Sequence, residues 1–539
     1  MSTASRAPLL LLSLGLLVLW RLLAAWHGNI ELYADEAQYW TWALQPDWGY
    51  FSKPPMVAWA IWLSRTLFGD AEIGVRAISL LLYPVTAWVL FLLVRRLFKT
   101  HPQREDMAFW SALTFATLPL VSLGSWLITT DAVLLLFWSL SLYFTVAALE
   151  SGRWRDWLLL GCALGAGFMS KYSMVFYGLG FLAWLLLMPR QRKLLRDPRP
   201  YAAAAVALLL LAPNLIWNAR HDFVSVQHTA EISQLDRGLF HPGAMLEFVL
   251  GQFLVFGPLL FAGLMLLVLR PRTWLDDERL RLLAAFTLAP LAAFMALSLL
   301  SRAFANWAAF AYVGGAALIA AVWVAQGHRR WLIAALALHL AMAAAMYHAH
   351  DITRALDIQL TRKTDPYGRV TGYRELGREV ALRLQIHPEA RLLSNDRKLH
   401  ALLRYYARPG SEGMRYLNPN GTRDNHYALS ADLRDSPKGE FLLVSQGVEA
   451  RQLAAWFAQV TPQAPIRLNL YPDYQPEYQV WLLRDYRQVA PACPQGVGRG
   501  CNAAQTPAAT TTLSLPAPSS HPKDAGRDAG ATNPPRSPG

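Results

Sequence analysis

The stretch that decides the fold runs from residue 31 to residue 55 and reads ELYADEAQYWTWALQPDWGYFSKPP. Tryptophan and tyrosine at this density are typical of a segment at a membrane–water interface. Two adjacent acids, Asp35 and Glu36, stand near its start, and Lys53 stands near its end, directly before two prolines. Ionised side chains at such an interface are costly unless they bind a charged group or take part in a reaction. We therefore expect this loop to carry the active site.

The composition is that of a polytopic membrane protein. Of 539 residues, 54% are hydrophobic and 16% are charged, whereas about a quarter of the residues of a soluble domain are charged. The formal net charge is +13, but the Lys and Arg residues stand in short clusters between apolar runs. This placement is typical of topology signals and argues against a nucleic-acid partner.

Apolar runs close to the ~20 residues that cross a bilayer recur along the chain. We expect about eleven membrane helices, with interfacial helices in the first loop, and therefore a mainly α fold. The expected spans are residues 8–26, 74–94, 107–123, 131–149, 157–170, 172–188, 202–217, 244–269, 281–300, 304–325 and 331–348.

The basic residues predict the orientation of these helices. Clusters of Lys and Arg follow the second, fourth, sixth, eighth and tenth runs, and the positive-inside rule places such clusters in the cytoplasm. The first loop and everything after residue 348 then lie outside. The unusual polar residues gather on that outer face: Asp35, Glu36, Lys53, Asp131, Lys171, His221, Asp222, Arg302 and Asn306.

Residues 351–485 change character, because polar residues become frequent and no spanning run appears. Alternating helical and extended patterns predict a small outer α/β domain after a membrane domain of residues 1–350. The tail, residues 486–539, is rich in Pro, Ala, Thr, Ser and Gly, and we expect it to be disordered. The expected helices are 372–384, 398–407 and 448–459, the strands are 391–395, 441–445, 466–470 and 478–483, and residues 409–439 form a long loop.

The acids have structural as well as functional interpretations. A carboxylate at a dry interface can act as a general base or bind a metal. Asp35 could instead cap the helix that begins beside it, although capping explains one acid and not the pair. Asp131 opens a helix after two threonines, so capping and catalysis are equally good explanations for it.

The cations have a similar pair of interpretations. The prolines after Lys53 restrict its backbone, and a fixed ammonium suits a phosphate; Lys171 and Arg302 could meet the same anion. Each could otherwise anchor the chain in lipid headgroups. Arg76 is expected to pair with an acid such as Glu72. We expect the site to be lined by Tyr33, Tyr39, Tyr50, Tyr172 and Asn306.

Some motifs are absent from the sequence. A Gly-rich phosphate loop followed by Lys-Ser/Thr is missing, which argues against an ATP-driven machine, and neither HExxH nor a Cys/His cluster indicates a zinc site. Nucleotide sugars stay in the cytoplasm. A sugar transferase whose site faces outward must therefore take its donor from the membrane as a lipid-linked group.

Six segments resemble one known family. They are YADEAQYW (33–40), FSKPPMVAW (51–59), TTDA (129–132), SKYSMVF (170–176), PNLIWN (213–218) and NWAAFAY (306–312). They are similar to the bacterial branch of the protein O-mannosyltransferase superfamily, which includes the aminoarabinose transferase of lipid A and the galacturonic acid transferases of rhizobial lipopolysaccharide. The resemblance covers residues 1–350 well.

The resemblance implies the GT-C fold, a polyprenyl-phosphate sugar donor and inverting transfer on the periplasmic side of the inner membrane, with lipid A or lipopolysaccharide core as acceptor. It implies that Asp35 is the catalytic acid, that Lys53 contacts the donor phosphate and that Asp131 is a second acid near the site. Two positions depart from the aminoarabinose transferases, since Ser52 replaces a Glu and Gln38 an Arg. They argue against aminoarabinose as the transferred sugar and against a metal site that uses that Glu. Which hexose or pentose is transferred, and whether a divalent metal takes part, stay open.

Other functions remain open from the sequence. A protein O-glycosyltransferase would share the same motifs. A transporter or lipid flippase would place its charges near the bilayer midplane on broken helices, and a lipopolysaccharide ligase would have a large outer loop. A binding module on a membrane anchor would need far fewer helices.

Overall fold

The computed structural model of the chain describes residues 5–233 and 240–487. Six helices are long and apolar enough to cross a membrane, and a bent pair, α5 (Arg104–Thr117) and α6 (Pro119–Ser125), makes a seventh if it is counted as one span, within these residues. The protein is therefore a multi-pass membrane protein. The six are α1 (Ala7–Gly28), α4 (Glu72–Leu97), α7 (Thr130–Ser151), α10 (Pro198–Arg220), α15 (Glu278–Leu300) and α17 (Arg329–Tyr347).

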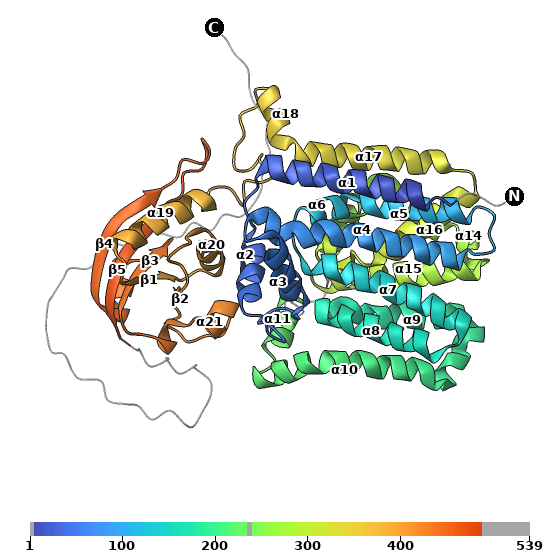
Figure 1. Ribbon diagram of the computed structural model, residues 1–539, viewed down its shortest axis with the longest axis horizontal. Helices are drawn as coiled ribbons and strands as arrows, with labels where there is room; N and C mark the ends of the chain where they lie inside the picture. The colour runs from blue at the N-terminus through green and yellow to red at the C-terminus, as the bar shows by residue number, and fades with distance from the viewer. Residues whose placement is uncertain (1–4, 234–239, 488–539) are drawn as a thin grey trace, which may run out of the picture. The chain divides into compact units, whose positions relative to one another are not determined.

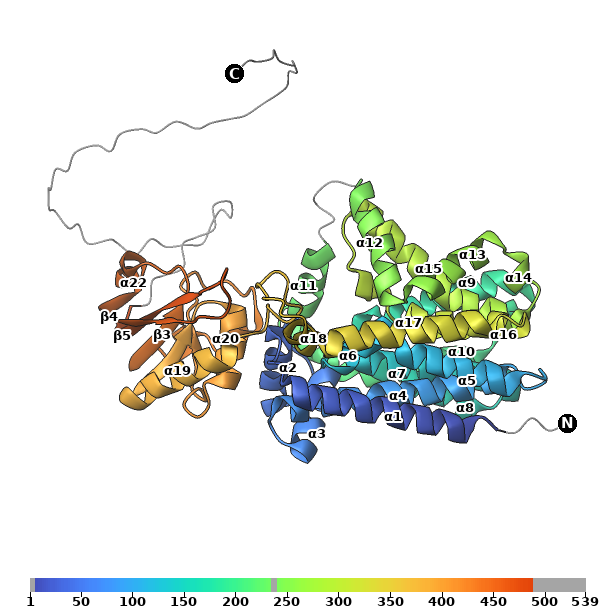
Figure 2. The same cartoon turned by 90° about the horizontal axis from the view of Figure 1, so that it is seen from above.

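Shorter helices complete the bundle. Helix α4 packs against α5 and α7, and α8 packs against α7 and α10, so these helices run side by side (Figures 1 and 2). The shorter elements are α8 (Trp154–Ser170), η1 (Tyr172–Val175), α9 (Phe176–Leu187), η2 (Pro189–Arg196), α11 (Val224–Ser233), α12 (Pro242–Val255), α13 (Pro258–Leu269), α14 (Arg272–Leu275), η3 (Ala305–Ala308), α16 (Ala311–Ala325) and α18 (Ala349–Ala355).

Every expected span overlaps a helix, but three of them are not continuous. The run 304–325 begins with η3, and a turn separates η3 from α16. The run 107–123 bends by 57° between α5 and α6, where Pro119 begins the second helix. The run 244–269 breaks into α12 and α13 at Gly257, whose φ is 94°, followed by Pro258. A side chain at Gly257 would collide with the ring of His339. The expectation of one helix here is wrong, because this glycine has a left-handed backbone and the proline cannot continue the helix.

The first loop folds into two short helices, α2 (Ala34–Leu44) and α3 (Met56–Phe68). Asp35 and Glu36 lie in the first turn of α2, where negative charge complements the helix dipole. Glu36 Oε2 also accepts a hydrogen bond from the backbone N–H of Tyr33 at 3.0 Å, which caps the helix. Trp40 and Trp42 are buried, and their rings contact Tyr405 and His426, so aromatic packing holds this loop against residues far along the chain.

A five-stranded sheet follows the membrane helices, in the order β2-β1-β3-β5-β4. Strand β1 pairs in parallel with β2 and with β3, and β5 pairs antiparallel with β3 and with β4. The elements are α19 (Tyr373–Ile386), β1 (Ala390–Ser394), α20 (Arg397–Tyr406), β2 (Arg415–Tyr416), α21 (His426–Ser430), η4 (Leu433–Asp435), β3 (Glu440–Ser445), α22 (Ala450–Trp456), β4 (Phe457–Arg467) and β5 (Glu477–Tyr486).

Three expectations for this region are corrected. The stretch 409–439, expected to be a long loop, contains β2, α21 and η4. The helix expected at 448–459 ends at Trp456, and residues 457–467 form strand β4, so the strand expected at 466–470 is the end of a longer one. Pro462 and Pro465 lie inside β4, and prolines argue against a strand when the sequence is read alone. They are tolerated here because β4 is an edge strand. The tail expected to be disordered lies outside the described residues, apart from its first two.

The sheet region is fastened to the first loop. The carboxylate of Glu31 accepts hydrogen bonds from the backbone N–H groups of Gly372, Tyr373 and Arg374 at 3.2, 2.6 and 3.0 Å, and so caps α19. Helix α20 packs directly against α2 (Figure 1). Consequently, side chains from α20 reach the acids of the first loop.

Candidate functional site

The two adjacent acids of α2 have opposite surroundings. Glu36 is buried, and its oxygens accept from Arg76 Nε at 2.8 Å and from Arg76 Nη2 at 2.6 Å. They also accept from the backbone N–H of Ile128 at 3.0 Å, in addition to that of Tyr33. Arg76 was expected to pair with an acid such as Glu72, but Glu72 pairs with Arg374 instead. Glu36 therefore joins α2 to α4 and to the segment before α7.

Asp35 faces the other way. Its side chain is 63% exposed, whereas that of Glu36 is 3% exposed. Arg397, the first residue of α20, donates from Nη1 to Asp35 Oδ1 at 3.1 Å and to Gln38 Oε1 at 2.7 Å. Gln38 is buried, so the amide fixes the guanidinium that orients the carboxylate. Arg397 was not predicted from sequence, because no motif marks it and it lies 362 positions after Asp35.

The predicted cations and the second acid come together beside this helix. Lys171 Nζ, just after α8, donates to Asp131 Oδ1 in the first turn of α7 at 2.7 Å. Lys53 Nζ forms no ion pair or hydrogen bond with a described residue. Burial and then the charge of Lys171 lower the pKa of Lys53 to about 8, while Asp131 and Asp35 oppose this shift. Lys53 is therefore a half-buried cation without an ion-pair partner among the described residues.

Both lysines lie at one wall of a cavity of about 420 Å³, which we call the lysine cavity. Other walls are apolar and come from α9, α15 and the segment around η3. An apolar cavity with two ammonium groups suits a ligand that joins a hydrocarbon chain to an anion. The apolar lining includes Val175, Phe176, Phe294, Leu297, Phe304 and Trp307.

The remaining predicted residues divide into two groups. Tyr172 lines the lysine cavity, and its hydroxyl donates to Asn214 Oδ1 at 2.9 Å. Arg302 and Asn306 are exposed, although the Arg302 guanidinium lies 4.5 Å from the ring centre of Phe304 and so beside the rim. The aromatic residues of the first loop do not line this cavity: Tyr33 precedes α2, and Tyr50 lines a second cavity. Tyr39 is buried against Trp42 but stays near the acids, because burial and the charges of Asp35 and Asp131 raise its pKa.

A metal-binding set is not found at this site. Within residues 5–233 and 240–487, no three or more His, Cys, Asp or Glu side chains are grouped so that they could hold a metal ion. Both oxygens of Glu36 already accept two hydrogen bonds each. The residues present therefore do not fit a metal at the acid pair, and we derive no step that uses one.

Comparison with known proteins gives concordant matches. A family model described as dolichyl-phosphate-mannose-protein mannosyltransferase matches residues 52–217. Lipid A galacturonosyltransferase RgtD of Rhizobium johnstonii is 30% identical over 446 residues, which cover 81% of this chain and 90% of that protein. An undecaprenyl phosphate-alpha-4-amino-4-deoxy-L-arabinose arabinosyl transferase of Pseudomonas aeruginosa is 32% identical over 232 residues, 39% of this chain and 40% of that protein.

The fold also matches a solved structure. ArnT from Cupriavidus metallidurans bound to undecaprenyl phosphate superimposes with a TM-score of 0.60 at 15% identity, over 91% of this chain and 100% of that chain. At this identity the likeness shows that the two proteins share a fold.

The opposite surroundings of the two acids generate a stability test. Glu36→Gln leaves Arg76 buried without its charge partner, and we expect a loss of about 3–5 kcal/mol. Asp35→Asn changes an exposed pair and should cost less than about 1 kcal/mol. Thermal unfolding of both purified variants in the same detergent measures the difference. Equal unfolding temperatures would contradict the structural role of Glu36.

Proposed function

This chain belongs to the bacterial branch of the protein O-mannosyltransferase superfamily and has its GT-C fold, and we propose that it transfers a sugar from a polyprenyl phosphate to lipid A or lipopolysaccharide core. The relative that supports this acceptor is the lipid A galacturonosyltransferase, which the chain matches over 90% of its length. The observation that carries the proposal is the lysine cavity, which has the chemistry of a lipid phosphate site. The positive-inside pattern favours the inner membrane, with this site on the periplasmic side.

In the proposed reaction the donor lies with its hydrocarbon chain in the lysine cavity and its phosphate at Lys53 and Lys171. The acceptor oxygen attacks the anomeric carbon of the sugar while the bond from that carbon to the phosphate oxygen breaks, which inverts the configuration. Negative charge grows on the leaving phosphate. Fixed cations stabilise this charge in the transition state, which is usually the largest catalytic term.

Asp35 is the proposed base. Its carboxylate is exposed to an incoming acceptor, and Arg397 and Gln38 hold it in one orientation. It takes the proton of the acceptor hydroxyl as that oxygen attacks the anomeric carbon. Asp131 acts through Lys171, because their ion pair fixes the position of the ammonium. Glu36, proposed from sequence as catalytic, supports the loop.

The reaction is tested in a strain that lacks the gene. Mass spectrometry of its lipopolysaccharide should find one sugar mass missing, and the intact chain should restore it. Asp35→Asn should insert normally and restore less than about 1% of that sugar, because general base catalysis contributes about 10²–10⁴-fold. Asp222→Asn is the matched control, since Asp222 is also an exposed acid paired with an arginine. Full restoration by Asp35→Asn would refute its role, and an unchanged lipopolysaccharide in the deletion strain would refute the acceptor.

The lowered pKa of Lys53 predicts a pH dependence of donor binding. The ammonium is charged below its pKa of about 8 and neutral above it. Affinity of the purified protein for undecaprenyl phosphate should therefore fall about tenfold between pH 7 and pH 9. Lys53→Arg keeps its charge and should lose this dependence. A wild-type affinity that is constant over this range would contradict a role for the Lys53 charge.

A further inference from the structure

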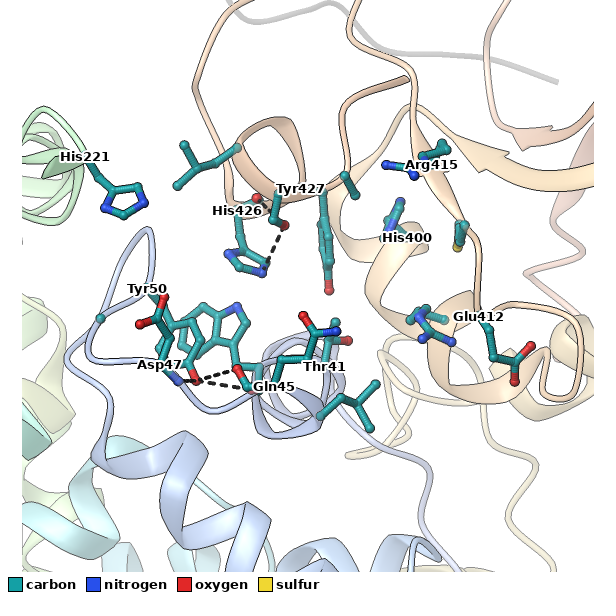
Figure 3. A pocket seen from close by; sticks show the side chains of 18 of the residues that line it. Thr41, Gln45, Asp47, Tyr50, His221, His400, Glu412, Arg415, His426 and Tyr427 are labelled. Carbon is teal, nitrogen blue, oxygen red and sulfur yellow. Dashed lines mark hydrogen bonds between the residues drawn. The ribbon is translucent and has the colours of Figure 1, made fainter. Parts of the chain in front are cut away.

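A second cavity, of about 490 Å³, lies between the first loop and the sheet region. We call it the arginine cavity. Thr41, Gln45 and Tyr50 line it from the first loop, and His400, His426 and Tyr427 face them from α20 and α21 (Figure 3). It shares no lining residue with the lysine cavity.

Several polar groups in this cavity lack a partner. The hydroxyl of Tyr427, a residue that is 1% exposed, forms no well-aligned hydrogen bond with a described residue, although Thr41 lies close enough to act on its pKa. Arg415 Nε and His426 Nδ1 are also buried and without a partner among the described residues. An unsatisfied buried polar group costs free energy, so three of them around one cavity indicate a polar ligand.

The charges in the cavity point to an anion. Arg404 and Arg415 line it, and neither guanidinium forms an ion pair with a described residue. Of the acids in the lining, Asp47 accepts hydrogen bonds from Trp217 Nε1 and from the backbone N–H of Trp48, both at 2.7 Å. Glu412 accepts from the backbone N–H of Gly410 at 2.8 Å. Asp47 is thus engaged elsewhere, whereas the charge of Glu412 acts on Arg404 without forming an ion pair. Arg404 Nη1 also donates to Ser411 Oγ at 3.3 Å, so the guanidinium of Arg415 is the more available of the two for an anionic ligand.

The histidines do not add to this charge. Burial lowers the pKa of His426 to about 3 and holds the pKa of His400 well below its ordinary value. Both rings are neutral at pH 7 and can offer hydrogen bonds only. Anion recognition therefore falls to Arg404 and Arg415, whose forked geometry suits carboxylates and phosphates.

Aromatic rings supply the third component. The rings of Trp42 and Tyr50 stack with their centroids 4.5 Å apart, and Trp217 lines the same cavity. Aromatic groups combined with a few fixed polar groups are typical of small-molecule sites, and the faces of sugar rings, which carry C–H groups, pack on such surfaces.

The position of the arginine cavity relates it to the reaction. The backbone N–H of Tyr50 donates to the carbonyl of Lys53 at 3.1 Å, which closes a tight turn. Tyr50 lines the arginine cavity, while Ser52 and Lys53 line the lysine cavity. One turn of the chain therefore contributes to both cavities, so two ligands bound in them would be neighbours.

We propose that the arginine cavity binds an anionic saccharide of the acceptor glycolipid, with Arg404 and Arg415 at its phosphate or carboxylate. The proposal rests on the proposed function, because it assigns the second substrate of that reaction. It separates the donor anion, held by lysines, from the acceptor anion, held by arginines.

The test measures binding of bisphosphorylated lipid A to the full-length protein in nanodiscs. Arg415→Gln should bind it about tenfold more weakly, with undecaprenyl phosphate binding unchanged. Lys53→Ala should show the reverse pattern. Arg467→Gln, an exposed arginine paired with Glu477, is the charge-matched control and should bind both lipids like the wild type. Equal lipid A binding by Arg415→Gln and the wild type would overturn the proposal.

Two further probes identify the anion. They are lipid A with its phosphates removed, and the same phosphate-free lipid A carrying acidic 3-deoxy-octulosonic acid residues. Tighter binding of bisphosphorylated lipid A than of either probe identifies phosphate as the recognised anion. Tighter binding of the probe that carries the acidic sugar residues identifies carboxylate. Equal affinity for the neutral glycolipid would overturn anion recognition.

A conservative variant separates a loss of binding from a loss of folding. Tyr427→Phe removes only the unpartnered hydroxyl, and it should weaken lipid A binding without lowering the unfolding temperature; unchanged binding by this variant would count against the cavity. A wild-type protein that binds lipid A but no undecaprenyl phosphate would instead count against the proposed donor.

Discussion

The buried ion pair between Glu36 and Arg76 is the interaction on which the site depends. It makes two hydrogen bonds from one guanidinium and leaves the carboxylate oxygens to accept two backbone N–H groups as well. Removing one partner of such a pair is strongly destabilising, because the other charge stays buried. Adjacent residues of a helix do not share a face. Fixing Glu36 inward therefore turns Asp35 outward, toward Arg397.

Helices from distant parts of the chain complete this arrangement. The charged groups at the lysine cavity come from the loop before α3, the start of α7 and the end of α8. The sheet region adds Arg397 and is itself fastened through Glu31. An apolar cavity that contains lysines and a polar cavity that contains arginines then lie on either side of residues 50–53. This separation suits a reaction that takes one substrate from the bilayer and the other from the aqueous side.

Much of this could be predicted from sequence, for physical reasons. Membrane spans leave long apolar runs, and a charge at an interface is rare enough to mark Asp35 and Lys53. The break at Gly257-Pro258 was readable as a turn signal but lay inside a run long enough for one span. The ion-pair partner of Arg76 was not predictable: Arg76 pairs with Glu36, and Glu72 pairs with Arg374, which lies far along the chain. Arg397 and the arginine cavity likewise depend on contacts between segments hundreds of residues apart.

The most direct measurement is an experimental structure of the full-length protein with undecaprenyl phosphate bound. We expect the phosphate to lie within about 3 Å of Lys53 Nζ and Lys171 Nζ. We expect the hydrocarbon chain to lie along Phe176, Phe294 and Trp307. A phosphate bound without contact to Lys53, or a hydrocarbon chain outside the lysine cavity, would contradict this expectation.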